Sequence, residues 1–212
     1  MSSYDMKKIV LLSRKSFLAK IQTHIAKIEI NKIKKNLIDI HYSSSVGDKD
    51  LSAKAWEQHG FGIFTNSLSK KLVLKEADVV VHSYKDLPVK NLNKTSFVCL
   101  KREDPRDIIL IKRSSLNKKK LVIGTSSPRR KYYLKKLKEF LPFQELKSIQ
   151  IRGNVPSRLE KVLNSSKEDG LFIAKAAIDR ILKYGQKIDK KEYKNFRLNF
   201  EKFEKVILPI SE

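Results

Sequence analysis

The sequence is short of cysteine and of long apolar runs. A single cysteine, Cys99, excludes an internal disulfide framework and favours a reducing compartment. Cys99 lies in the apolar run 95–100, which predicts a strand, so we expect a buried structural thiol rather than a nucleophile. No apolar stretch approaches the roughly 18 residues of a membrane-spanning helix, and the N-terminus lacks a signal-peptide pattern. We therefore expect a cytoplasmic protein with no membrane partner.

Signatures of nucleotide and metal sites are also missing. The chain contains neither G-x-x-x-x-G-K-[ST] nor G-x-G-x-x-G, the glycine patterns that bring backbone N–H groups to phosphates. Asp104 and Asp107 lack the spacing of metal ligands, and we expect them to cap turns or pair with arginine. The four histidines are isolated, and His82, beside a buried strand, is expected to be structural. We predict no metal.

The charge is strongly positive: 46 Lys and Arg against 23 Asp and Glu give a net charge of +23. One explanation is a polyanionic partner such as nucleic acid. The other is a lysine-rich, solvated surface. The lysines are scattered from Lys7 to Lys205, and no basic segment carries interleaved aromatics or another nucleic-acid signature. The pattern favours the surface explanation, and nucleic-acid binding stays as the weaker alternative.

Hydrophobic periodicity predicts an α/β fold with two βαβ-type halves. In the first half we predict strands at 8–12, 36–41, 78–81 and 95–100 and helices at 16–32 and 67–76. In the second we predict strands at 107–111, 121–124, 148–152 and 170–174 and helices at 127–140 and 156–163. The block 101–105 interrupts this pattern and predicts the boundary.

The segment 77–88 combines a buried strand with a polar end. Val79 to Val81 predict the strand, and His82, Ser83, Lys85 and Asp86 follow before Pro88 stops it. Ligands of open α/β sheets bind at the carboxyl ends of strands. Asp86 is therefore a candidate for chemistry on a positively charged intermediate, although such polar groups can also simply cap the next element.

Arginine is rare in this lysine-rich chain, and eight of its ten arginines fall at junctions between elements. Arginine binds carboxylate or phosphate through two parallel hydrogen bonds, which lysine cannot do. Two segments, 121–131 and 148–158, both run from a strand through glycine and a polar turn into a helix, with arginine beside the turn. Such helix starts can bind anions, and together they favour a polycarboxylate or polyphosphate ligand over ordinary capped helices.

These blocks together resemble the hydroxymethylbilane synthase family, also called the porphobilinogen deaminase family. The matching segments, in family order over residues 8 to 180, are Ser13-Arg-Lys-Ser16, Phe61-Gly-Ile-Phe64, Val81-His-Ser-Tyr-Lys-Asp-Leu-Pro88, Arg102-Glu-Asp-Pro-Arg-Asp107, Gly124-Thr-Ser-Ser-Pro-Arg-Arg130, Arg152-Gly-Asn-Val-Pro-Ser-Arg158 and Ala174–Arg180.

The resemblance implies two domains of type II periplasmic-binding-protein-like fold with a cleft between them, which we place at 1–101 plus 205–212 and at 102–204. It implies a transferase of porphyrin biosynthesis that deaminates porphobilinogen and joins four units into linear hydroxymethylbilane. A dipyrromethane cofactor would prime the chain. Porphobilinogen and polypyrrole polycarboxylates would be the partners of a monomeric enzyme.

The resemblance also implies roles for individual residues. The catalytic carboxylate would be Asp86. The cofactor's carboxylates would be held by Ser16, Ser83, Lys85, Thr125, Ser126, Ser127, Arg129 and Arg130. The substrate and the elongating chain would be bound by Arg14, Arg152, Arg158 and Arg180, with Gly153 and Asn154 shaping the turn.

Three features depart from the family pattern. Phe61 stands where the family has a lysine, and Pro128 replaces an aliphatic residue. Beyond Ile210 the family continues into a third domain with the cysteine that attaches the cofactor, and we expect that domain and cysteine to be absent. Two hypotheses follow: a short enzyme that still forms hydroxymethylbilane, and a pyrrole- or anion-binding protein of the same fold without turnover.

Overall fold

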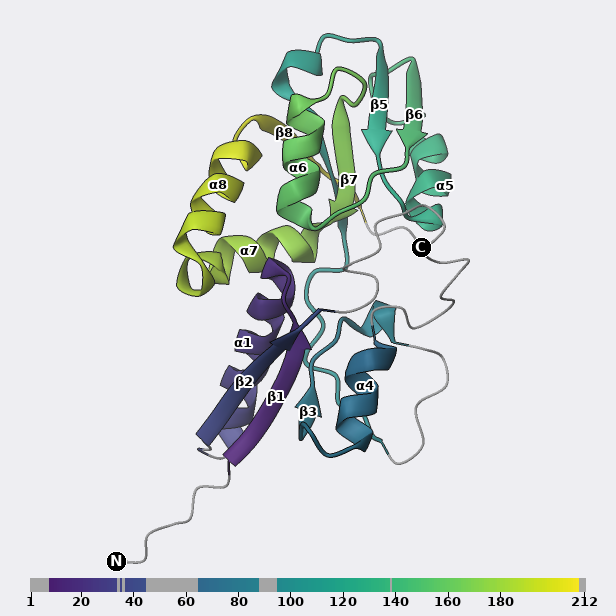
Figure 1. Ribbon diagram of the computed structural model, residues 1–212. Coiled ribbons are helices and arrows are strands. Elements are labelled where there is room, and N and C mark those ends of the chain that lie inside the picture. The colour runs from purple at the N-terminus through teal and green to yellow at the C-terminus, as the bar shows by residue number, and fades with distance from the viewer. Residues whose placement is uncertain are drawn as a thin grey trace, which may run out of the picture. The chain divides into compact units, whose positions relative to one another are not determined.

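The computed structural model describes residues 8–33, 35, 37–44, 65–87, 95–137 and 139–209 (Figure 1). Helices and strands alternate along most of this part of the chain, so the predicted α/β class is confirmed. The chain divides into two compact units, Met1–Lys101 and Arg102–Glu212. The segment Phe61–Phe64, with its expected departure from the family, and Pro88 lie outside the described residues.

The first unit contains a parallel sheet with strand order β2-β1-β3 in its described part. Its elements are β1 (Lys8–Arg14), α1 (Phe17–Ile33), β2 (Leu37–Ser43), α4 (Asn66–Val73) and β3 (Val79–Val80). Leu12 of β1 packs with Leu68 of α4 and with Ala77, while Phe17 and Ile21 bury one face of α1. Because all three strands are parallel, their carboxyl ends meet at one edge of the sheet.

The predicted strand at 95–100 is wrong. In the structure these residues form neither strand nor helix, and Phe97, Val98 and Cys99 are exposed. The expectation of a buried thiol at Cys99 is wrong for the same reason. A β-branched and aromatic run becomes a strand only where a neighbouring strand forms backbone hydrogen bonds with it. Within the described residues no strand pairs with this segment.

The second unit is built on a five-stranded mixed sheet within the described residues, with the order β6-β5-β7-β4-β8. Its elements are β4 (Asp107–Lys112), η2 (Arg113–Ser115, a 3₁₀ turn), β5 (Lys120–Gly124), α5 (Pro128–Leu137), β6 (Glu145–Ile149), α6 (Val155–Asn164), β7 (Gly170–Ala174), α7 (Lys175–Ile188), α8 (Lys190–Phe200) and β8 (Phe203–Ile207). Strands β5, β6 and β7 are parallel, and β4 is antiparallel to both its neighbours, β7 and β8.

The core of the second unit lies on the sheet. Ile109 and Ile111 of β4, Ile123 of β5 and Phe172 of β7 are buried together with Leu134 of α5. Strand β4 is buried along nearly its whole length, which is typical of a central strand covered on both faces. The sheet therefore forms a rigid support for the loops that leave its edges.

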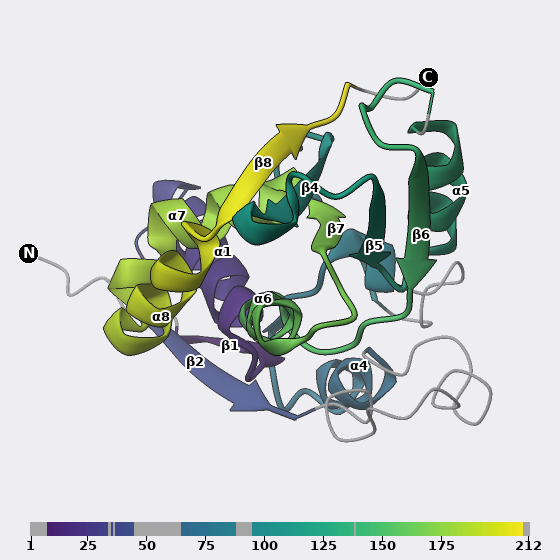
Figure 2. The ribbon, with the colours of Figure 1, turned by 90° about the horizontal axis from the view of Figure 1, so that it is seen from above.

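The sequence analysis placed residues 205–212 in the first unit, and this placement is wrong. The end of the described chain belongs to the second unit. Strand β8 pairs with β4, in the register Ile108↔Ile207 and Lys112↔Phe203 (Figure 2). The N–H of Leu208 donates to the carbonyl of Asp107 at 3.0 Å, and Leu208 is buried in the core of the second unit. Antiparallel pairing with β4 and burial of Phe203 and Leu208 hold this segment in the second unit.

Candidate functional site

The polar segment after β3 lies beside the end of β1. Strands β1 and β3 are parallel, and the N–H of Val81 donates to the carbonyl of Leu12 at 2.9 Å, which continues the pairing past β3. Residues Tyr84–Asp86 then form the 3₁₀ turn η1, closed by the N–H of Asp86 on the carbonyl of Ser83 at 2.9 Å. The turn brings Asp86 back toward Arg14, the last residue of β1.

Asp86 and Arg14 form a loose ion pair. Arg14 Nη1 lies 3.9 Å from Asp86 Oδ2, and each side chain is 21% exposed. This separation is too long for a hydrogen bond, although the two charges still interact strongly at a partly buried position. The Asp86 carboxylate therefore lies beside a cation without being hydrogen-bonded to it by this contact.

The remaining predicted residues of the first unit surround the same strand ends. Ser16 immediately precedes α1, and its carbonyl accepts from the N–H of Lys20 at 3.0 Å. Gln22 Nε2 of α1 donates to Ser83 Oγ at 3.0 Å, which ties the polar segment to the helix. Lys85 is exposed on η1. The structure thus brings together Arg14, Ser16, Ser83, Lys85 and Asp86 at one sheet edge.

His82 is a partly buried polar neighbour of this edge. Burial, and secondarily the positive charge of Arg14, lower the pKa of His82 to about 4. Its Nε2 is buried and makes no hydrogen bond within the described residues. His82 is therefore neutral at physiological pH, so it adds no positive charge to that of Arg14 beside Asp86.

In the second unit, the buried carboxylate of Asp107 collects two of the predicted arginines. Asp107 begins β4 and pairs in register with Ala174, the last residue of β7, so it lies at the edge where β5, β6 and β7 end. Arg129 Nη2 donates to Asp107 Oδ2 at 2.6 Å, and Arg130 Nη2 donates to Oδ1 at 2.9 Å. The expectation that Asp107 pairs with arginine is confirmed, as is that for Asp104, which binds Arg106.

The two arginines differ in exposure. The Arg129 side chain is 60% exposed, whereas that of Arg130 is 14% exposed and Asp107 is 6% exposed. Arg130 Nε also donates to Asp107 Oδ1, at 3.2 Å, so Asp107 positions the Arg130 guanidinium closely. Arg129 keeps most of its surface for solvent or a ligand.

The hydroxyl residues between β5 and α5 bind the chain's own backbone. The N–H of Thr125 donates to the carbonyl of Ile149 at 2.8 Å, and Ser126 Oγ donates to the carbonyl of Ile151 at 2.5 Å. Ser127 Oγ accepts from the N–H of Arg130 at 3.5 Å. These bonds join the turn after β5 to the chain after β6, so both predicted arginine-bearing turns form one structure.

The turn after β6 depends on glycine and asparagine. Gly153 has φ +120°, a left-handed conformation, and a Cβ there would lie 2.4 Å from Ser157 Oγ. Asn154 is the N-cap of α6, and its Oδ1 accepts from the N–H of Ser157 at 2.9 Å. Arg158 Nε donates to the carbonyl of Gly153 at 2.7 Å, which folds this arginine back onto the turn.

Three arginines of the second unit share one electrostatic environment. Burial lowers the pKa of Arg158, and the positive charges of Arg130 and Arg152 lower it further. Placing like charges together in a partly desolvated position is unfavourable unless an anion compensates them. This arrangement therefore favours binding of carboxylate or phosphate groups. The sequence analysis predicted that arginines of these two turns would lie near one another, from their positions at two strand-to-helix junctions.

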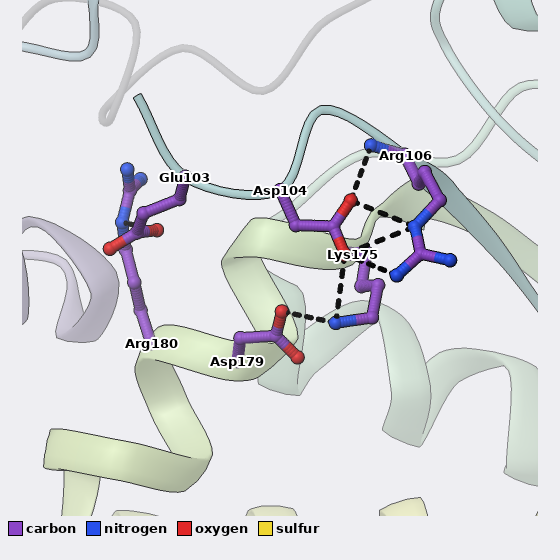
Figure 3. Close-up of polar contacts among 6 residues, drawn as sticks. All are labelled: Glu103, Asp104, Arg106, Lys175, Asp179 and Arg180. Carbon is purple, nitrogen blue, oxygen red and sulfur yellow. Dashed lines mark hydrogen bonds and ion pairs between the residues drawn. The ribbon is translucent and has the colours of Figure 1, made fainter. Parts of the chain in front are cut away.

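Arg180 lies apart from this group in its contacts. It belongs to α7, and its Nε is 2.7 Å from Glu103 Oε2 (Figure 3). Arg130 instead pairs with Asp107, and Arg158 donates to the carbonyl of Gly153. Glu103 received no role in the sequence analysis, because only the fold brings it to α7.

The described ranges contain neither a metal-ligand cluster nor a membrane-spanning helix. In these ranges, no three or more His, Cys, Asp and Glu side chains come together as metal ligands would. Among the described helices, none has both the length and the apolar character needed to cross a membrane.

The fold is that of an α/β protein built of two compact units, with polar groups at the carboxyl ends of its parallel strands. A family model described as "Porphobilinogen deaminase, dipyromethane cofactor binding domain" matches residues 9–203. The chain belongs to this porphobilinogen deaminase family.

Curated relatives carry the same name. The chain is 36% identical over 178 residues to the porphobilinogen deaminase of Ruminiclostridium cellulolyticum, covering 83% of this chain and 59% of the relative. It is 35% identical over 195 residues to a probable porphobilinogen deaminase of Picrophilus torridus, covering 90% and 63%. It is 37% identical over 187 residues to that of a Synechococcus species, covering 84% and 57%. The chain thus spans less than two thirds of the length of these relatives.

Among solved structures, a protein from work on glutathione import in Streptococcus mutans aligns with a TM-score of 0.44 and 13% identity, over 98% of this chain and 78% of that one. A probable extracellular-binding protein of an amino-acid transporter from Bacillus subtilis aligns with a TM-score of 0.39 and 12% identity, over 84% and 75%. Scores this low do not define a shared fold, which rests here on the elements and on the family.

Proposed function

We propose that the chain is the porphobilinogen-binding and catalytic part of a hydroxymethylbilane-forming transferase of tetrapyrrole biosynthesis, acting as a monomer in the cytoplasm. Membership of the porphobilinogen deaminase family supports the reaction class. The observation that carries the proposal is the half-buried Asp86 carboxylate, 3.9 Å from Arg14 at the carboxyl edge of the first sheet.

Asp86 is the proposed catalytic carboxylate. When ammonia leaves porphobilinogen, the remaining azafulvene carries positive charge, and a fixed carboxylate in a partly desolvated site stabilises that charge. The same oxygens accept hydrogen bonds from pyrrole N–H groups. Arg14, 3.9 Å away, can bind a substrate carboxylate beside Asp86.

The arginines of the second unit are the proposed carboxylate-binding groups. Each pyrrole of the substrate and of the product carries acetate and propionate side chains, so the growing chain is a polycarboxylate. Arg152 and Arg158 would bind the substrate and elongating chain, together with Arg14 and Arg180. The turn that presents Arg158 is formed by Gly153 and Asn154.

The cofactor expected from the family is dipyrromethane, which when bound supplies the terminal pyrrole that attacks the substrate. The residues present fit its carboxylates, because two guanidinium groups, those of Arg129 and Arg130, lie together on Asp107 at the end of the strands. We propose that the cofactor is held by Ser16, Ser83, Lys85, Thr125, Ser126, Ser127, Arg129 and Arg130. Of these, Arg129 is the most exposed arginine and can turn toward a ligand while Asp107 holds Arg130 in place.

The experiment is to incubate the purified chain with porphobilinogen and to measure ammonia release and uroporphyrin formation. The chain should release ammonia, and Asp86→Asn should abolish the release. The matched control is Asp39→Asn, which removes an aspartate of the same unit that pairs with Lys8 and His41 on β1 and β2. No turnover by the unmodified chain, with Asp86→Asn indistinguishable from it, would refute the proposal.

A second candidate is a pyrrole- or anion-binding protein without turnover. The grouped charges of Arg130, Arg152 and Arg158 favour it, because they support binding whatever Asp86 does. The same experiment separates the two functions: tight binding of porphobilinogen with no ammonia release would establish the binding protein. Nucleic-acid binding, suggested by the net charge of +23, would persist after Arg152→Gln, since it needs only dispersed lysine charge.

A further inference from the structure

Two neighbouring acidic residues, Glu103 and Asp104, are held in different ways. Asp104 accepts hydrogen bonds from the backbone N–H of Arg106 at 3.0 Å and from its guanidinium at 2.7 to 3.1 Å. Lys175 Nζ adds an ion pair at 3.3 Å and itself binds Asp179 at 2.5 Å. Figure 3 shows Asp104 between Arg106 and Lys175. These contacts strongly lower the pKa of Asp104 and fix its carboxylate in the structure.

Glu103 has a single ion pair within the described residues, to Arg180. Glu103 Oε2 lies 2.7 Å from Arg180 Nε, and the two side chains are 37% and 26% exposed. A partly exposed pair of this kind contributes little stability, because water and salt compete with it. Glu103 can therefore leave Arg180 at small cost, whereas Asp104 cannot leave its partners.

We infer that Glu103 is an internal competitor for Arg180, occupying the guanidinium until a ligand carboxylate displaces it. The inference rests on the proposed function, in which Arg180 binds carboxylates of the substrate or the growing chain. Glu103 presents to Arg180 the same chemical group as the ligand, at hydrogen-bonding distance. It thus weakens the binding of a carboxylate at Arg180 and favours release of bound chains.

The size of the effect follows from the ion pair. A ligand that binds only the free guanidinium has its apparent affinity reduced by the fraction of Arg180 that is free. For a partly exposed pair this corresponds to a reduction of about two- to five-fold. The network around Asp104 keeps the backbone of residues 104–106 in place, so a change at Glu103 should not disturb it.

The test compares dissociation constants for porphobilinogen by calorimetry. Glu103→Gln should tighten binding about two- to five-fold. The matched control is Glu201→Gln, because Glu201 forms an equivalent 2.7 Å ion pair with Arg197 on α8. It removes the same charge from a chain of net charge +23, so it measures any general increase in attraction for anions.

A double-mutant cycle assigns the effect to Arg180. In an Arg180→Gln background, Glu103→Gln should leave the affinity unchanged, because the guanidinium for which Glu103 and the ligand compete is no longer there. Unchanged or weaker binding in Glu103→Gln overturns the inference, since weaker binding would mean that Glu103 positions Arg180 for the ligand. Equal tightening with and without Arg180 also overturns it.

A second measurement distinguishes failure of this inference from failure of the proposed function. The Arg180 Nε–H resonance, assigned by its loss in Arg180→Gln, is followed by NMR during titration with succinate, a simple dicarboxylate. Glu103→Gln should shift the resonance before titration and lower the succinate concentration needed to change it. If porphobilinogen does not bind but succinate behaves in this way, the proposed function fails and the competition stands. Identical succinate titrations of the two proteins overturn the competition.

Discussion

The two sheet edges that carry the predicted site use charge in opposite ways. At the edge of the first unit, a carboxylate, Asp86, lies 3.9 Å from its arginine and is not hydrogen-bonded to it by that contact. At the edge of the second unit, the carboxylate of Asp107 is buried and holds two arginines at 2.6 and 2.9 Å. The first carboxylate is accessible to a ligand, and the second is part of the structure.

This difference indicates a division of labour between the units. The Asp86 carboxylate can stabilise a positive charge that develops on a ligand, because Arg14 lies 3.9 Å away and does not hydrogen-bond to it by that contact. Asp107 instead compensates part of the positive charge of the arginine group, so that Arg130, Arg152 and Arg158 can lie together. We therefore assign the chemistry to the first edge and anion binding to the second, and four variants test that assignment.

The largest expected effect is on turnover in Asp86→Asn. Loss of a charge-stabilising group in a shielded site lowers turnover by about 100-fold or more. The Asp86 side chain is 21% exposed and its ion pair with Arg14 is 3.9 Å long, so loss of that pair should change the free energy of unfolding little. Ammonia release and urea unfolding measure the two quantities. An active Asp86→Asn protein would place the chemistry elsewhere.

The opposite pattern is expected for Asp107→Asn. Removing the charge leaves the buried Arg130 uncompensated, and the free energy of unfolding should fall by about 2–3 kcal/mol. That estimate lies at the low end for buried pairs because Arg129 is well exposed. Urea denaturation measures the change, with Asp39→Asn as an exposed control. An unchanged midpoint would show that Asp107 is not the structural carboxylate of this edge.

Arg158→Gln should separate binding from stability. Affinity for porphobilinogen should fall by about ten-fold, the effect of losing one charge-assisted interaction. The free energy of unfolding should change by less than about 1 kcal/mol, because relief of repulsion from Arg130 and Arg152 offsets loss of the hydrogen bond to the Gly153 carbonyl. Calorimetry and urea denaturation test both, with Arg113→Gln as the control. Loss of stability without loss of affinity would make Arg158 a structural residue.

The fourth variant concerns the pH dependence of stability caused by His82. Its pKa is about 4 in the folded chain and about 6.5 in the unfolded chain, so between these values only the unfolded chain binds the proton. The stabilisation is therefore complete above pH 6.5 and is lost as the pH falls toward 4.

The matching variant is His82→Gln, compared with His41→Gln at an exposed position. Between pH 7 and pH 4.5 the unmodified chain should lose about 2 kcal/mol more than His82→Gln. Unfolding curves at the two pH values provide the measurement. Parallel losses in all three proteins would mean that His82 does not titrate as described.

Much of the local structure could be predicted because it depends on neighbouring residues. The apolar run of β5, the glycine that ends it and the helix start at Pro128 all lie within a few positions of one another. Strand β7, predicted at 170–174, agrees with the structure residue for residue. The sequence also shows arginines at two strand-to-helix turns. These turns lie together in the structure because they follow the adjacent parallel strands β5 and β6.

What could not be predicted depends on pairing across long stretches of chain. Residues 205–212 were expected to join the first unit, but β4 offers the unpredicted strand β8 an antiparallel edge. The run 95–100 has the composition of a strand but no paired neighbour among the described residues. Helix α8 lies in a lysine-rich stretch where burial of Phe196 and Phe200, rather than a motif, defines the element. The pairing of Glu103 with Arg180 joins positions that no local pattern relates.

The most direct test of the division of labour is a titration of porphobilinogen into Asp86→Asn and Arg158→Gln, with ammonia release measured on the same samples. Asp86→Asn should bind porphobilinogen within about three-fold of the unmodified chain while releasing almost no ammonia. Arg158→Gln should bind about ten-fold more weakly and still release ammonia when saturated. If Asp86→Asn instead loses binding and Arg158→Gln keeps it, chemistry and anion binding are not divided between the two edges.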